Sequence, residues 1–144
     1  MTHHPTLKII AFVGSDPATV QTVMDHYTEK GYPKVSHEDM ATQITNLSEA
    51  GQHHIVTDEI TDFEMYHQLR HTFPGELFLI AILPSADIAQ YKESASHEIQ
   101  NWDEQKRTGH TRLLELAQYY IESDGHEKMY THIHELFEEL NFIN

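Results

Sequence analysis

The chain has 144 residues, 39% of them hydrophobic, and a formal net charge of −14 at pH 7 with histidine neutral, which predicts one folded domain spanning 1–144. So acidic a chain lacks the basic surface that nucleic acids and anionic membranes require, and the absence of cysteine excludes disulfides, thiol chemistry and cysteine-based zinc sites. No apolar run reaches transmembrane length and no signal-peptide pattern is visible, so we expect a cytoplasmic protein.

The first predicted elements are a buried strand, a tight turn and an amphipathic helix. Residues 9–13 form a short apolar run, which is typical of a central parallel strand covered on both faces. The sequence GSDP follows, in which Asp16 is suited to cap a helix and Pro17 to occupy its first position. The helical period then sets Val20 on the buried face, and Gly31 ends the helix.

The rest of the chain alternates between extended and helical patterns. Strands are expected at 32–36, 53–57, 77–83 and 119–122, and helices at 37–50, 62–73, 111–118 and 126–140. Strands that alternate with helices predict a three-layer α/β domain with a five-stranded parallel sheet. We expect the polar stretch 86–109 to form a mobile, lid-like segment.

The carboxyl ends of the predicted strands carry the candidate functional residues, because ligands of such sheets bind at those ends. They are 14–16 after the first strand, 36–39 after the second, 58–59 after the third and 84–85 after the fourth.

A strand, a glycine turn and a helix also make the frame of a phosphate-binding loop, GxxxxGK[ST]. If Gly14 is its first glycine, Thr19 stands at the position of the second glycine, Val20 at that of the lysine and Gln21 at that of the hydroxyl residue. The strand, turn and helix are therefore present, but the residues that bind phosphate are absent. Helix N-terminal amides alone can still bind an anion, and the alternative is a turn that is present only because the fold needs it.

If the backbone of the loop is intact, we expect the triple variant Thr19→Gly, Val20→Lys and Gln21→Ser to bind nucleotide. The candidate nucleotide- or anion-binding residues are Gly14, Ser15, Asp16, Thr19, Gln21 and Thr22.

The order of these features resembles the P-loop kinases of small phosphorylated metabolites, the nucleoside monophosphate kinases and dephospho-coenzyme A kinases. The resemblance is carried by IIAFVGSDPATVQTVMDHYTEKGYPKVSHEDM at 9–40, HIVTDEITDFEMYHQLRHTFPGELFLIAIL at 54–83 and YYIESDGHEKMYTHIHELFEEL at 119–140. It implies a P-loop kinase-like α/β/α fold with strand order 2-3-1-4-5, Mg-ATP as cofactor and a small phosphorylated ligand.

The departures from this family fall on the residues that handle phosphate. Val20 and Gln21 stand at the lysine and hydroxyl positions, Thr61 stands at an arginine position, and the lid arginines fall at about Ala89 and Lys92. Phosphoryl transfer depends on positive charge around the moving group. We therefore expect a degenerate, catalytically inactive member of the group that acts through weak nucleotide or anion binding or through protein contacts.

Acids remain at three positions that the family uses, one of them Glu64 after the missing arginine. The resemblance implies a substrate-side acid at Asp39 and a magnesium-associated acid at Asp58, although both are also ordinary helix-cap or strand-end residues. The alternative hypothesis is an active ATP-dependent phosphotransferase with a non-standard loop. In it the latter two acids hold magnesium, and Lys92, Arg107 or Arg112 supplies positive charge.

A third hypothesis comes from the 13 histidines. Glu64, His67 and His71 fall on one face of the predicted third helix, opposite its apolar stripe. Two histidines one turn apart with a carboxylate beside them are a pattern that binds zinc, which suggests a metal- or pH-responsive module. A solvated helix face in a histidine-rich chain gives the same pattern.

Overall fold

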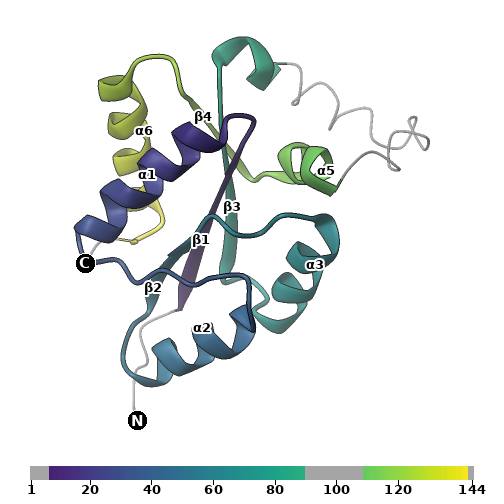
Figure 1. Ribbon diagram of the computed structural model, residues 1–144. Helices are drawn as coiled ribbons and strands as arrows, with labels where there is room; N and C mark the ends of the chain where they lie inside the picture. Colours follow the sequence, from purple (N-terminus) through teal and green to yellow (C-terminus); the bar gives the residue numbers. More distant parts are fainter. Residues whose placement is uncertain (1–6, 90–108, 143–144) are drawn as a thin grey trace.

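The computed structural model describes residues 7–89 and 109–142, without the side chains of 109–112, and shows an α/β fold (Figure 1). The elements, in chain order, are β1 (Lys8–Gly14), α1 (Pro17–Glu29), α2 (Met40–Glu49), β2 (His54–Thr57), α3 (Phe63–Thr72), β3 (Leu77–Leu83), α5 (Gly109–Leu116), β4 (Tyr119–Glu122) and α6 (His126–Glu139). Residues 85–89 are also helical, whereas most of the predicted lid, 90–108, lies outside the described residues. None of the helices in the described ranges has the length and apolar character needed to cross a bilayer.

The sheet confirms the prediction of parallel strands flanked by helices. Its four strands in the described residues run parallel in the order β2-β1-β3-β4. Ile10 of β1 pairs with Val56 on one side and with Phe78 on the other. The two central strands are almost entirely buried, which is why their sequences are continuous apolar runs rather than alternating ones.

The predicted fifth strand at 32–36 is not confirmed. This segment contacts β2 through an isolated parallel bridge between Lys34 and Val56. The Val56 amide donates to the Pro33 carbonyl at 2.9 Å, and the Val35 amide donates to the Val56 carbonyl at 3.2 Å. Pro33 has no N–H and β2 is only four residues long, so few backbone donors and acceptors are left to extend the pairing between this segment and β2.

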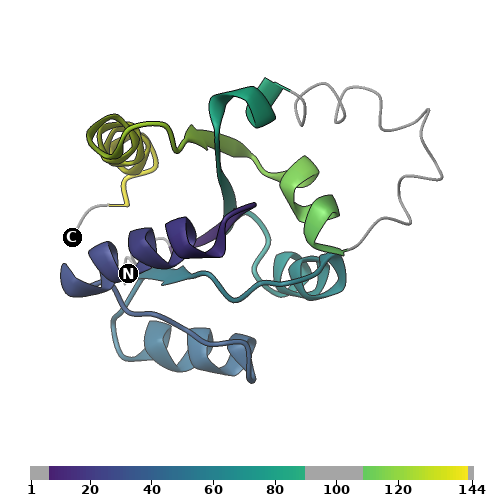
Figure 2. The same cartoon turned by 45° about the horizontal axis from the view of Figure 1, so that its top comes forward.

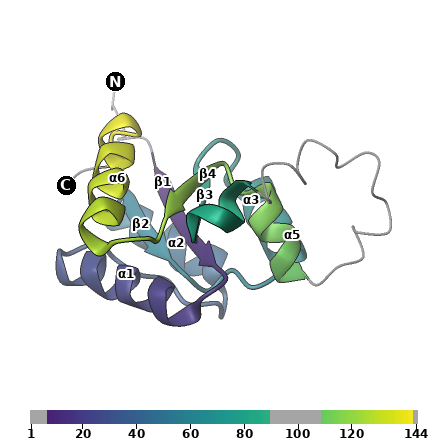
Figure 3. The ribbon, with the colours of Figure 1, turned by 90° about the horizontal axis from the view of Figure 1, so that it is seen from above.

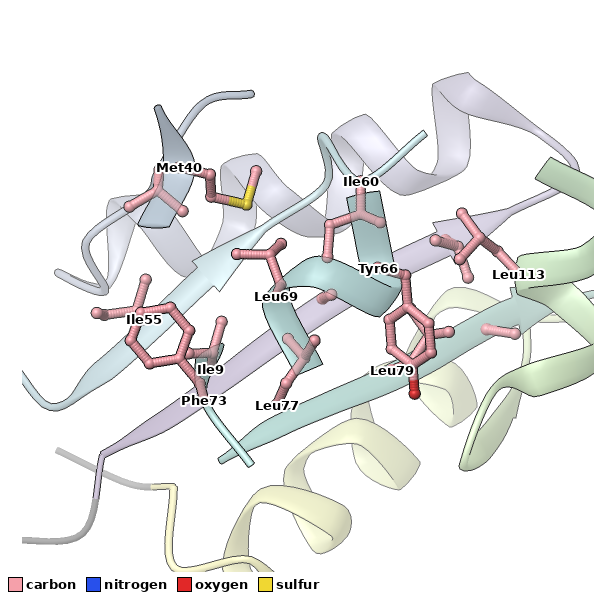
Figure 4. Close-up of a cluster of buried hydrophobic side chains, with 14 of the residues drawn as sticks. Ile9, Met40, Ile55, Ile60, Tyr66, Leu69, Phe73, Leu77, Leu79 and Leu113 are labelled. Carbon is pink, nitrogen blue, oxygen red and sulfur yellow. The ribbon is translucent and has the colours of Figure 1, made fainter. Parts of the chain in front are cut away.

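Helices cover both faces of the sheet, as Figures 2 and 3 show. Side chains alternate along β1, so Ile9 packs with α2, α3 and α5, whereas Ile10 and Phe12 pack with α1 and α6. Figure 4 shows the first of these cores, in which Tyr66 and Leu69 of α3 lie over the sheet. The sheet therefore lies between two cores, and the carboxyl ends of its strands carry the candidate site.

Helix α2 begins three residues later than predicted, at Met40 instead of 37. Asp39 precedes it in the left-handed conformation, with φ 46° and ψ 46°, so the chain turns before the helix starts. The side-chain amide of Gln43 closes this turn by donating to the Ser36 carbonyl at 3.1 Å and to its Oγ at 3.0 Å. These contacts join residues seven positions apart, which a periodicity analysis does not detect.

Candidate functional site

The turn between β1 and α1 is much tighter than a phosphate-binding loop. Only Ser15 and Asp16 separate Gly14, the last residue of β1, from Pro17, the first residue of α1. A Cβ atom at position 14 would lie 2.6 Å from the Ile82 carbonyl oxygen and 2.8 Å from a methyl carbon of the Val20 side chain. Gly14 is therefore required for the close approach of β1, β3 and α1, whatever else this turn does.

A carboxylate of the chain itself occupies the N-terminus of α1. Asp16 Oδ1 accepts a hydrogen bond from the Ala18 amide at 3.1 Å, and Oδ2 accepts one from the Thr19 hydroxyl at 2.8 Å. The predicted cap is thus confirmed. Because a helix N-terminus attracts negative charge, this carboxylate lies where a bound phosphate would otherwise interact.

The remaining residues of the proposed loop make contacts within α1. The side-chain amide of Gln21 donates to Asp25 Oδ1 at 2.8 Å, and the Thr22 hydroxyl donates to the Ala18 carbonyl at 2.9 Å. Val20, at the position of the family's lysine, is 7% exposed and packs in the core shared by α1 and α6. These side chains therefore serve the helix and its packing.

The cap gives a direct stability prediction. We expect Asp16→Ala to lower the free energy of unfolding by about 1 kcal/mol, because the Ala18 amide loses its acceptor at the helix start. Urea denaturation measures the change. The matched variant Asp16→Asn keeps a capping oxygen and should lose much less; equal losses in both would mean that the cap does not stabilise α1.

A hollow of about 190 Å³ opens beside this turn, between the end of β1, the first turns of α1 and the segment after β2. It brings together three of the residues predicted from the sequence, since Gly14, Gln21 and Asp58 line it with Thr61. Asp39 does not belong to this group: it lines a separate hollow of about 300 Å³ between α2 and α3. The two acids expected to act together thus line different surfaces.

An ionic network surrounds Asp58. His37 and Glu59 belong to the strand ends that the sequence predicted to carry functional residues, whereas Lys34 was not predicted. The Lys34 ammonium lies 3.5 Å from Asp58 Oδ1 and 3.6 Å from Glu59 Oε2. Glu59 Oε1 accepts hydrogen bonds from the His37 ring at 3.0 Å and from its backbone amide at 3.3 Å. Asp58 Oδ1 is buried and has no hydrogen-bond partner among the described residues, so the contact with Lys34 is an ion pair without a hydrogen bond.

The network makes stability depend on pH. The hydrogen bond from the His37 side chain holds the pKa of the Glu59 carboxyl below its usual value of 4.5. A carboxyl whose pKa is lower in the folded state stabilises the protein above 4.5, and this contribution is lost as the pH falls through the folded-state pKa.

We therefore expect Glu59→Gln to be less sensitive to acid than the parent chain. Its free energy of unfolding should fall less between neutral pH and pH values below 4.5. Because the Glu59 side chain is 29% exposed, the difference should be below about 1 kcal/mol. Urea titrations at several pH values test this, with Glu49→Gln, an exposed glutamate at the end of α2, as the control. Identical pH profiles for Glu59→Gln and the parent would contradict the assignment.

The histidine cluster predicted on α3 is exposed. Glu64, His67 and His71 all face solvent, and the His67 ring stacks on Phe63 with centroids 5.7 Å apart. Within 7–89 and 109–142 no group of three or more histidine, aspartate or glutamate side chains is placed to hold a metal ion. The metal site therefore remains a prediction without support from the geometry.

Lys92 and Arg107, two of the cations that an active kinase would use, lie outside the described residues, as does the side chain of Arg112. Neither the comparison with family models nor the comparison with curated proteins found a match for this chain. The resemblance to P-loop kinases consequently rests on the sequence segments quoted above.

Proposed function

We propose that this chain is a P-loop kinase-like α/β domain that has lost phosphoryl transfer. It acts by binding a protein partner or a small ligand. The observation that carries the proposal is the Asp16 carboxylate at the N-terminus of α1, which accepts from Ala18 and Thr19. A nucleotide phosphate placed there would meet the negative charge of Asp16, which already accepts from the Ala18 amide.

The strand order supports the likeness to this fold. Val56 bridges to 32–36 and also pairs with β1, so 32–36 lies along the outer edge of β2. Counted as a rudimentary edge strand, this segment would give five strands in the order 2-3-1-4-5 that the resemblance implies.

The charge around the turn supports the loss of kinase chemistry. Among the described residues that line the hollow, Asp58 is the one that is charged at neutral pH, and its charge is negative. Lys34, the cation that the described residues place beside Asp58, is paired with both Asp58 and Glu59. Since phosphoryl transfer needs cations around the γ-phosphate, this arrangement disfavours both ATP binding and the reaction.

A thermal-shift titration tests the proposal. We expect no ATP-dependent increase in melting temperature with ATP and magnesium, compared with magnesium alone. A ligand at 100 times its Kd would stabilise the fold by about 2.7 kcal/mol, or by several degrees in a domain of this size. A clear ATP-dependent shift that disappears in Asp58→Ala would overturn the proposal and favour the active kinase. A zinc-dependent shift that disappears in His67→Ala would favour the metal module.

A further inference from the structure

We propose that the hollow beside Asp58 binds a small organic ammonium ion, a primary amine with a short apolar body. The inference rests on the proposed function, because it assigns a ligand class to the site where the family would hold phosphate. Three observations carry it: the hollow itself, the incompletely compensated charge of Asp58, and the apolar character of the surrounding wall.

The charges beside the hollow leave a surplus of one negative charge. Asp58 and Glu59 contribute two negative charges, and the ammonium of Lys34 lies within 3.6 Å of both. Because Lys34 is shared between the two carboxylates, the sum over Asp58, Glu59 and Lys34 is −1. A cation that enters the hollow beside Asp58 would neutralise this excess.

Asp58 is also short of hydrogen-bond donors. Its side chain is only 11% exposed, and its Oδ1 atom has no hydrogen-bond partner in the described part of the chain. A buried carboxylate without donors is costly, and an ammonium group offers three N–H donors together with a positive charge. Because Oδ1 itself is buried, a ligand in the hollow would donate to the part of this carboxylate that remains accessible there.

The rest of the wall selects an organic cation over a hydrated metal ion. Val13, Pro17, Val20 and Ile60 present apolar surface to the hollow, which suits an alkyl chain. Magnesium prefers six oxygen ligands and keeps several waters, but Asp58 is the single carboxylate among the described lining residues. The volume of about 190 Å³ corresponds to about six water molecules, which limits the ligand to a short chain.

Titration of the full chain with n-propylammonium chloride, followed by ¹H–¹⁵N NMR, tests the inference. We expect saturable shifts that are confined to the residues around the hollow, and at least tenfold weaker binding in Asp58→Asn, equivalent to about 1.4 kcal/mol. Asp124→Asn is the matched control, because Asp124 also follows a strand but does not line this hollow. Thr61→Phe provides a second variant that fills the hollow and keeps the carboxylate.

The control ligands decide between the alternatives. Equal shifts with n-propanol would show an apolar pocket without cation recognition, and tighter binding of magnesium at the same residues would show a metal site; either result overturns the inference. Undiminished binding in both Asp58→Asn and Thr61→Phe, or no saturable shifts at all, would overturn it as well. An ATP-dependent thermal shift instead overturns the proposed function, so the two failures are distinguishable.

Discussion

Replacing Phe142 by alanine is expected to lower the free energy of unfolding by about 3–5 kcal/mol. Phe142 is fully buried although it lies three residues after the end of α6. Its ring stacks on Tyr32 at 5.2 Å with an interplanar angle of 6°, and it contacts Phe137 at 4.8 Å and His54 at 5.0 Å. The substitution removes these contacts and leaves a cavity between α6 and the edge of the sheet.

The backbone around Phe142 keeps the cavity from closing. The Phe142 amide donates to the Phe137 carbonyl at 2.7 Å, and the Phe142 carbonyl accepts from the Tyr32 hydroxyl at 3.1 Å. The Lys8 ammonium also donates to the Leu140 carbonyl. With the segment fixed at these points, collapse onto the missing ring is restricted, so we expect the upper part of the range.

Urea denaturation of the variant, monitored by circular dichroism, measures this loss. The control is Phe63→Ala, since Phe63 is 37% exposed and its truncation should cost less than about 1 kcal/mol. A loss for Phe142→Ala no larger than that of the control would mean that the segment after α6 is not held against the aromatic core in solution.

The central part of this fold was predictable from local sequence. Residues 9–13 and 77–83 are continuous apolar runs, and they form the two buried strands in the middle of the sheet. Asp16 and Pro17 correctly mark the start of α1, because capping depends on neighbours in the sequence. Burial on both faces and local capping leave a clear trace in composition and spacing.

The edge of the sheet was harder to predict, because tertiary contacts determine it. The segment 32–36 has the composition of a strand, but its pairing is limited to the bridge at Lys34. The start of α2 depends on the left-handed Asp39 and on Gln43, which bonds back to Ser36. Neither effect has a periodic signature. The pairing of 32–36 is limited by Pro33 and by the short β2, and the start of α2 depends on one left-handed residue and one long side chain.

The site shows the same division between local and long-range information. The spacing of GxxxxGK[ST] aligned Val20 with a phosphate-binding lysine, whereas the helical period placed Val20 on the buried face of α1. The structure confirms the second interpretation, because Val20 is 7% exposed and packs in the core shared by α1 and α6. A signal for the ionic network was present in the adjacent acids Asp58 and Glu59, but its partner Lys34 comes from a segment 24 positions earlier in the chain.

Restoring the phosphate-loop residues provides the sharpest test of the turn. We expect the triple variant Thr19→Gly, Val20→Lys and Gln21→Ser to bind no ATP and to lose several kcal/mol of unfolding free energy. Val20 is 7% exposed and packs in the core beside Gly14 as well as lining the hollow, so lysine at position 20 would disrupt this packing and carry a charge out of water. Desolvating that charge costs far more than the turn can return, because Ser15 and Asp16 are too few residues to wrap a phosphate.

Two measurements separate the contributions of position 20 and of the loop. The double variant Thr19→Gly and Gln21→Ser keeps Val20 and should lose only about 1–2 kcal/mol, mostly from glycine in the first turn of α1. Urea denaturation ranks the two variants, and the thermal-shift titration with ATP and magnesium tests nucleotide binding in each. A folded triple variant that gains an ATP-dependent shift would contradict this account. It would mean that the turn can open into a phosphate loop and that the Asp16 cap does not prevent phosphate binding. The chain would then have kept the backbone of a kinase loop and lost only the side chains that bind phosphate.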